Sequence, residues 1–155
     1  MQTKIVPNIW FKDRAEEAMK YYCSIIPDSK IISIDYYPDE SYDEHFKGMQ
    51  GKVWAGIFEI GGQRFSCIDG GDAGFQLNPS FSLMLNCRDQ AEIDYYWSKL
   101  SHVPEAEQCG WVVDKFGLSW QIIPENIEEL LKTPAQVQAM MQMKKLIIAD
   151  LENAK

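Results

Sequence analysis

Side chains that can form hydrogen bonds alternate with apolar side chains along several segments of this sequence. Because successive side chains of a strand point to opposite faces, each segment predicts a strand with one apolar face and one hydrogen-bonding face. A face wetted only by solvent usually carries Lys, Glu and Thr, whereas here it carries Ser, Asn, Gln and Met. This composition favours a partly polar ligand pocket. The predicted ligand-binding residues are Asn8, Trp10, Ser66, Ser82, Met84, Asn86, Ser119 and Gln121.

Side chains suited to acid–base catalysis are few. The two histidines, His45 and His102, fall in a polar loop and after a helical segment, where a solvated surface histidine is the expected state. A buried Asp69 or Glu59 could act as a general base, although an ordinary carboxylate at a strand end is the simpler interpretation. The sequence therefore does not identify an enzyme.

An internal repeat positions these residues. The run Asp13-Arg14-Ala15-Glu16 returns 76 positions later as Asp89-Gln90-Ala91-Glu92, each time after an apolar segment and before a helical pattern. A second echo, at an offset of 55 positions, relates residues 62–66 to residues 117–121, which both place a turn glycine three residues before an aromatic residue. Such echoes predict a fold in which one unit is used twice.

Each copy predicts the order strand, helix, strand, strand, strand. Asp13 and Asp89 are the predicted helix N-caps, each followed three residues later by the glutamate of a capping box. The helices are predicted to end at about Ile26 and Leu100. Predicted strands are 5–11, 30–37, 53–60 and 64–69 in the first copy, then 81–87, 108–113, 119–123 and a very short strand near 103–105 in the second.

Length and composition predict one compact domain made of two modules. The chain has 155 residues, 46% apolar and 12% aromatic, which is typical of a globular protein. We expect a single domain over 1–155, with modules 1–78 and 79–132 and a C-terminal helix over 133–153, in which Thr133 is the N-cap and Pro134 the first helical residue. Val137, Met140, Met141, Ile148 and Leu151 would lie on one helical face. That methionine-containing stripe either packs on its own domain or a twin subunit, which is favoured, or forms a ligand or peptide groove.

Charge and hydropathy narrow the classes of partner. A net charge of −8 repels a phosphate backbone, so nucleic acid is not expected. The sequence has neither an apolar run approaching the roughly 18 residues of a membrane span nor a signal-peptide core, and we expect a cytoplasmic protein. Residues 36–51 are polar and predict a loop, which either closes over a site or is a surface hairpin.

The four cysteines are expected to be free thiols. Cys23, Cys67, Cys87 and Cys109 have no Cys-x-x-Cys spacing and lie mostly within apolar segments. A Cys–His nucleophile pair would need Cys67 or Cys109 beside a histidine, and nothing in the spacing requires it.

Seven segments together resemble the PhnB-like branch of the vicinal oxygen chelate superfamily, which also holds glyoxalase I, bleomycin resistance proteins and extradiol dioxygenases. The segments are 5–11, 15–22, 26–29, 59–65, 89–94, 107–111 and 114–121. The resemblance covers nearly the whole chain. It implies an α+β fold of paired βαβββ modules, each curling its sheet around a concave pocket, in a homodimer. The branch also carries a 3-demethylubiquinone 3-methyltransferase label, but the sequence lacks a glycine-rich loop between a strand and a helix for a nucleoside cofactor.

The resemblance further implies a divalent metal held by His and Glu side chains, and here the sequence departs from it. The corresponding positions carry Pro7, Asn8, Ala55, Ser66, Ser82, Leu83 and Gln121. Amide oxygens are weak neutral donors for metals that prefer imidazole or carboxylate. We therefore predict a protein that binds a small, partly apolar molecule without a metal or other cofactor. The alternatives are a metal-dependent lyase, isomerase or dioxygenase with differently placed ligands, and a dimeric scaffold.

Overall fold

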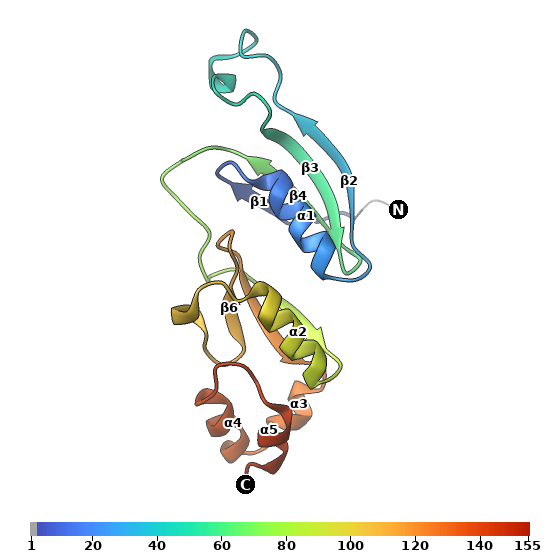
Figure 1. Ribbon diagram of the computed structural model, residues 1–155, viewed down its shortest axis with the longest axis vertical. Coiled ribbons are helices and arrows are strands. Elements are labelled where there is room, and N and C mark those ends of the chain that lie inside the picture. The colour runs from blue at the N-terminus through green and yellow to red at the C-terminus, as the bar shows by residue number, and fades with distance from the viewer. Residues whose placement is uncertain (1–2) are drawn as a thin grey trace. The chain divides into compact units, whose positions relative to one another are not determined.

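A computed structural model describes residues 3–155, which form two compact units (Figure 1). The first unit ends at Gln76, and the second unit is Leu77–Lys155. This boundary lies two residues before the predicted one, which followed residue 78. None of the helices in the described part of the chain has the length and hydrophobicity of a membrane span.

The first unit is a four-stranded sheet with one helix packed on it. Its elements are β1 (Asn8–Phe11), α1 (Ala15–Ile25), β2 (Lys30–Tyr36), the 3₁₀ helix η1 (Glu44–Phe46), β3 (Val53–Ile60) and β4 (Gln63–Asp69). The strand order is β1-β4-β3-β2, with β1 parallel to β4 and the other neighbours antiparallel. Met19 and Tyr22 of α1 and Phe58 of β3 are fully buried, so the core lies between α1 and one face of the sheet. The opposite face is open.

The second unit repeats this plan with a smaller sheet. Its elements are β5 (Ser82–Cys87), α2 (Gln90–Leu100), the 3₁₀ helix η2 (Pro104–Ala106), β6 (Trp111–Val113), β7 (Ser119–Pro124), α3 (Ile127–Leu130), α4 (Pro134–Met141) and α5 (Ile148–Asn153). The order is β5-β7-β6, with β5 parallel and β6 antiparallel to β7. Ile93 of α2 and Trp120 and Ile122 of β7 form its core.

Strand register confirms that the units are two copies of one plan. Asn8 pairs with Ser66 in the first sheet, and Met84 pairs with Gln121 in the second. The two offsets found in the sequence, 76 and 55 positions, carry Asn8 to Met84 and Ser66 to Gln121. The two offsets were found in different segments of the sequence, yet together they map the Asn8–Ser66 pair of the first sheet onto the Met84–Gln121 pair of the second. Such agreement is not expected by chance.

The second copy is nevertheless shorter than predicted. The expected strand near 103–105 is wrong, because Pro104–Ala106 form the 3₁₀ helix η2 and proline cannot donate to a strand ladder. The strand expected over 108–113 is reduced to β6, which begins at Trp111. Cys109 and Gly110, just before it, have φ of +51° and +87° and form a turn.

Only one of the two aspartates predicted as helix N-caps takes that role. Asp89 caps α2 and accepts the backbone N–H three residues later at 2.9 Å. Asp13 does not cap α1, whose N-cap is Arg14; instead the N–H of Ala15 donates to Asp69 Oδ1 at 2.8 Å. The acceptor is a buried carboxylate 54 residues away, which local sequence could not reveal.

The C-terminal helix predicted over 133–153 is interrupted. Thr133 starts α4 with the predicted N-cap, but residues 142–147 leave the helix before α5 begins. Cys109 and Gly110 donate their N–H groups to carbonyl oxygens of this linker, each at 2.8 Å. The linker carbonyls therefore accept hydrogen bonds from the turn before β6 and not from a continued helix. Leu146, within the linker, is fully buried.

Candidate functional site

A cavity of about 620 Å³ lies within the second unit. One side is the open face of the β5-β7-β6 sheet, and another is formed by Ile127, Leu131, Met140 and Met141, here called the C-terminal wall. Its volume is within the range of small-molecule sites, about 300–1,000 Å³. Asp, Glu, Lys, Arg and His are absent from its lining. The cavity therefore suits a neutral molecule.

Ser119 lines this cavity and carries its most informative polar group. The residue is 1% exposed, and its hydroxyl oxygen has no hydrogen-bond partner among residues 3–155. A buried, unpaired polar group costs free energy, since it gave up its bonds to water. Most such groups in proteins are paired, so this one calls for an explanation.

The direction of Ser119 follows from its neighbour. The indole N–H of Trp120 donates to Asp114 Oδ2 at 2.9 Å, and both residues are buried on the α2 side of the sheet. Asp114 Oδ1 also accepts the N–H of Leu118 at 3.1 Å, which fixes the turn into β7. Because side chains alternate along a strand, Ser119 points to the opposite face and into the cavity.

Gln121 supplies a second polar group two residues further along β7. Its Nε2 donates to Ser82 Oγ at 3.0 Å, which orients the amide across to β5. A side-chain amide has two N–H groups and a carbonyl oxygen, so this bond uses only part of its capacity. Gln121 also lines the cavity, whereas Ser82 accepts its hydrogen bond without being part of the lining.

Apart from Gln108, the rest of the lining is apolar and rich in sulfur. Met84, Cys109, Met140 and Met141 line the cavity together with Trp111 of β6. The Cys109 Sγ and Met141 Sδ atoms are 3.8 Å apart. Thioethers are polarisable and adapt to ligands of irregular shape. Met84 and Met141 are 58% and 53% exposed, so the cavity is open to solvent.

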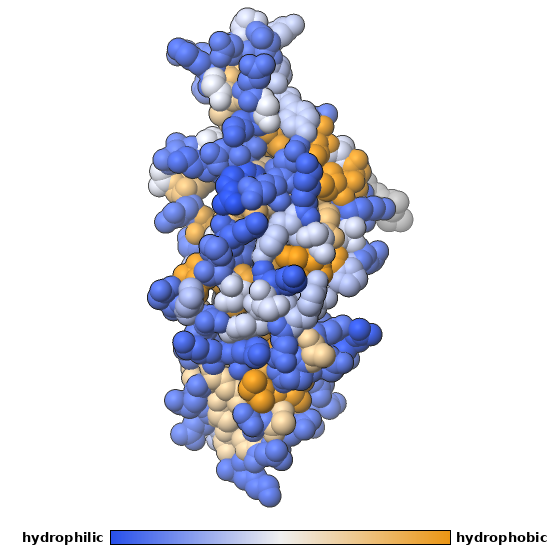
Figure 2. Space-filling view, viewed as in Figure 1, coloured by the Kyte–Doolittle hydropathy of each residue, from blue (hydrophilic) through white to orange (hydrophobic). Residues whose placement is uncertain are grey.

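The C-terminal segment that contains this wall is fixed to α2 and to Gln108 by specific contacts. The Gln90 amide donates to the Leu146 carbonyl at 3.0 Å and accepts the N–H of Ile148 at 2.8 Å. Gln108 Nε2 donates to the Met141 carbonyl at 3.0 Å. Figure 2 shows apolar residues gathered on the part of the second unit where α4 lies. The wall is thus an ordered part of the cavity.

The open face of the first unit is built differently. Asn8 Nδ2 donates to Ser66 Oγ at 2.7 Å across the parallel strands. Trp10 donates its indole N–H to the Gly71 carbonyl at 3.1 Å and lies so close to Gly70 that a Cβ there would be 2.0 Å from the ring. These three predicted binding residues are held by contacts within the first unit.

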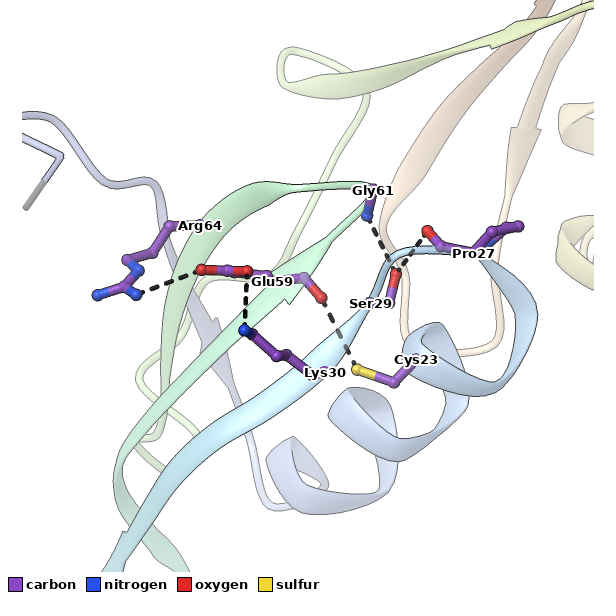
Figure 3. Close-up of polar contacts among 7 residues, drawn as sticks. All are labelled: Cys23, Pro27, Ser29, Lys30, Glu59, Gly61 and Arg64. Atoms are coloured by element: carbon purple, nitrogen blue, oxygen red, sulfur yellow. Dashed lines mark hydrogen bonds and ion pairs between the residues drawn. The ribbon is translucent and has the colours of Figure 1, made fainter. Parts of the chain in front are cut away.

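Charged groups also occupy this face, although the sequence predicted uncharged ones. Glu59 lies between Arg64 and Lys30, with ion pairs of 3.3 and 3.9 Å (Figure 3). This pairing gives Glu59 a role other than that of a free general base. Asp69 has a structural role too, since its two oxygens accept the N–H groups of Ala15 and Val53 at 2.8 and 2.9 Å.

Residues 37–52 form a packed loop beside this sheet. The rings of Tyr37, Phe46 and Trp54 contact one another with centroids 5.2–5.8 Å apart. The Tyr37 hydroxyl donates to the Asp69 carbonyl at 2.5 Å, and burial raises the pKa of this phenol. The loop is therefore anchored at its base. Its role as a lid stays a prediction.

The donor groups do not fit a divalent metal. The facing strand positions carry Asn8 with Ser66 in one unit and Met84 with Gln121 in the other. These are amide, hydroxyl and thioether groups, and the Asn8 and Ser66 side chains already bond to each other. Within residues 3–155, no three His, Cys, Asp or Glu side chains are grouped as metal ligands.

The four cysteines are free, as predicted. Cys67 in the first unit and Cys87 in the second are buried, and burial raises the pKa of each thiol to about 12. Both are therefore protonated at neutral pH. Cys109 is partly exposed and lines the cavity.

The eight predicted binding residues thus divide between the two units. Asn8, Trp10 and Ser66 belong to the first unit, and Ser82, Met84, Asn86, Ser119 and Gln121 to the second. Of these, Met84, Ser119 and Gln121 line the cavity, whereas Asn86 is exposed near the end of β5. The prediction missed Trp111 and Cys109, and it considered Met140 and Met141 only as part of a helical stripe. Alternation along residues 111–113 was the signal for Trp111.

Comparisons with known proteins agree with this fold. A sequence model of the family described as 3-demethylubiquinone-9 3-methyltransferase matches residues 3–123. The PhnB protein of Bacillus cereus is 34% identical with a TM-score of 0.64, over 79% of this chain and 98% of that one. Protein PA1353 of Pseudomonas aeruginosa, 17% identical, shares the fold with a TM-score of 0.57, over 79% and 97% of the two chains. No curated protein matches the sequence.

Proposed function

Because this chain belongs to the 3-demethylubiquinone-9 3-methyltransferase family, the PhnB-like branch of the vicinal oxygen chelate superfamily, we propose that it binds a small, partly apolar molecule without a metal. The observation that carries the proposal is the cavity of about 620 Å³ with Ser119 and Gln121 in its lining. Binding, not methyl transfer, is proposed, since the sequence has no glycine-rich loop for a nucleoside cofactor.

Four of the eight residues predicted from the sequence take part in this proposal. Met84, Ser119 and Gln121 contact the ligand, and Ser82 orients Gln121. Asn8, Trp10 and Ser66, in the first unit, and Asn86, near the end of β5, stay predicted binding residues that do not line this cavity. The uncharged cavity lining favours a neutral ligand, because a buried charge needs a partner.

A thermal-shift titration tests the metal-free part of the proposal. The purified protein is expected to carry less than stoichiometric metal and to gain little stability from Zn²⁺, Ni²⁺ or Mn²⁺. An ion bound at a true site would raise the melting temperature in proportion to its affinity. A saturable shift that Gln121→Ala abolishes would overturn the metal-free proposal and favour a metal-dependent enzyme.

We also propose a cytoplasmic homodimer. The exposed strand edges and the partly exposed side chains of α4 favour a covered surface, and a twofold pair is the commonest closed arrangement. Light scattering at micromolar concentration should report the mass of two chains. Dissociation on Met141→Glu would support the contact, and a monomer in the unchanged protein would refute it.

A further inference from the structure

We infer that the ligand of the second-unit cavity is a neutral, largely apolar molecule carrying one hydroxyl or carbonyl group, and that the Ser119 hydroxyl is its polar anchor. The inference rests on the proposed function, since it concerns the same cavity. It adds the chemical class of the ligand and the residue that selects it.

Ser119 is the anchor because its hydroxyl is buried without a partner. At 1% exposure the group has given up water, and no described residue replaces the lost bonds. Asp114 and Trp120 hold the register of β7, so the hydroxyl stays directed into the cavity. A ligand oxygen that bonds to Ser119 would satisfy this group, which a purely apolar ligand leaves unpaired.

A hydroxyl group both donates and accepts, so Ser119 alone admits either an alcohol or a carbonyl. Gln121, two residues along the same strand face, has further N–H and carbonyl capacity beyond its bond to Ser82. The two polar groups on β7 thus mark one polar end of the cavity.

Apart from Gln108, whose Nε2 donates to the Met141 carbonyl, the remaining lining sets the apolar character of the ligand. Trp111, Met84, Met140 and Met141 present an indole ring and three thioethers. No Lys, Arg, His, Asp or Glu lines the cavity, so an ionised ligand would lose hydration without gaining a counter-charge. The inferred ligand is therefore neutral. It has one polar group, and the rest of it is apolar and contacts the polarisable side chains of the cavity.

The C-terminal wall adds a second apolar surface to the cavity. Ile127, Leu131, Met140 and Met141 follow residue 123, where the family match ends. Gln108 Nε2 holds Met141 of the wall through a hydrogen bond of 3.0 Å to its carbonyl. The ligand would therefore contact a surface that lies beyond the matched region as well as the sheet.

Isothermal titration of the full chain with three probes of one shape tests the inference. The probes are 2-naphthol, naphthalene and 2-naphthoate, which differ in having a hydroxyl, no polar group, or a charge. We expect 2-naphthol to bind best, and 2-naphthoate to bind at least about tenfold more weakly. The Ser119→Ala variant should weaken 2-naphthol binding about fivefold to tenfold and leave naphthalene binding unchanged, as loss of one hydrogen bond predicts.

Two further variants keep the test decisive. Ser98→Ala removes an exposed serine of α2 and should bind all probes as the unchanged protein does. Ser119→Cys, which keeps the shape of the side chain with a slightly larger atom but weakens the hydrogen bond, should reproduce the loss if Ser119→Ala fails to fold. The inference would be overturned if 2-naphthol and naphthalene bound with the same affinity to the unchanged protein and to both Ser119 variants. Binding in the cavity would then still stand. Failure of all three probes to bind would overturn both the inference and the proposed function.

Discussion

The two units share strand register and helix placement but differ in how their open sheet faces are completed. The first unit fills its face with internal pairs, Asn8 with Ser66 and Glu59 with Arg64. The second unit leaves Ser119 unpaired and covers the face with a C-terminal wall. A repeated scaffold thus fixes where side chains point, while the residue types decide whether a face can serve as a binding site.

Removal of the buried carboxylates should give the largest effects. Asp69 pairs two backbone N–H groups in the first unit, and Asp114 pairs two backbone N–H groups and the Trp120 indole in the second. Because each buried unpaired donor costs about 1–3 kcal/mol, Asp69→Ala should lower the free energy of unfolding by about 3 kcal/mol and Asp114→Ala by more.

Urea denaturation measures both losses, and Asp35→Ala, an exposed site on β2, is the control. If both carboxylate variants lost less than about 1 kcal/mol of unfolding free energy, Asp69 and Asp114 would not be important for the stability of their own units.

In each unit, one glycine that lies close to neighbouring atoms should give the next largest effect. A Cβ on Gly56 would be 2.7 Å from Cys67 Sγ and 2.8 Å from Met19 Cε, and Met19 can partly move. A Cβ on Gly110 would be 3.0 Å from the Ile122 carbonyl, and its φ of +87° disfavours alanine as well. We expect losses of about 1–2 kcal/mol for Gly56→Ala and about 2–3 kcal/mol for Gly110→Ala.

Gly74→Ala isolates the backbone contribution, because its φ is +80° and nothing lies within 4 Å of a Cβ there. If Gly110→Ala costs no more than Gly74→Ala, the close approach of the C-terminal segment and β7 to Gly110 has no energetic role.

The buried thiols predict a smaller, pH-dependent effect in both units. Burial raises the pKa of Cys67 and of Cys87 to about 12 from an ordinary value of 9.0. The folded protein therefore keeps these protons to higher pH than the unfolded chain, and the stability they contribute, fully present below pH 9, is lost as pH rises toward 12. Melting temperature should fall less steeply above pH 9 in Cys67→Ala and in Cys87→Ala than in the unchanged protein. Parallel profiles would contradict this.

The smallest effect should come from the exposed pair in the first unit. Asn8→Ala removes a hydrogen bond to Ser66 on an accessible face, where water can replace it. We expect a loss of free energy of unfolding below about 1 kcal/mol and no change in 2-naphthol affinity. A loss of affinity as large as that of Ser119→Ala would move the binding site toward the first unit.

Sequence reasoning predicted the repeat and most elements because these follow from local patterns. The two offsets, the cap at Asp89 and the Thr133 cap were all readable within a few residues. The cap of α1 was not readable, since its acceptor is Asp69, and the break after α4 depends on distant N–H groups of the 109–110 turn.

The candidate site was predictable only where strand alternation decides it. Met84, Ser119 and Gln121 were found because they alternate with core residues on β5 and β7. The burial of the Ser119 hydroxyl without a hydrogen-bond partner depends on how other residues pack around it. Strand alternation predicts the face on which Ser119 lies but not this packing. Cys109 lies in a turn of positive φ, and Met140 lies on a wall, so neither belongs to a periodic strand pattern.

A nuclear magnetic resonance titration of the full chain with 2-naphthol tests most directly whether the second unit holds the ligand. Saturable shifts are expected at the backbone amides of Ser119, Gln121 and Met140, with Asn8 and Ser66 unchanged. Shifts confined to Asn8 and Ser66, with the amides of β7 and α4 unmoved, would contradict a binding site in the second unit.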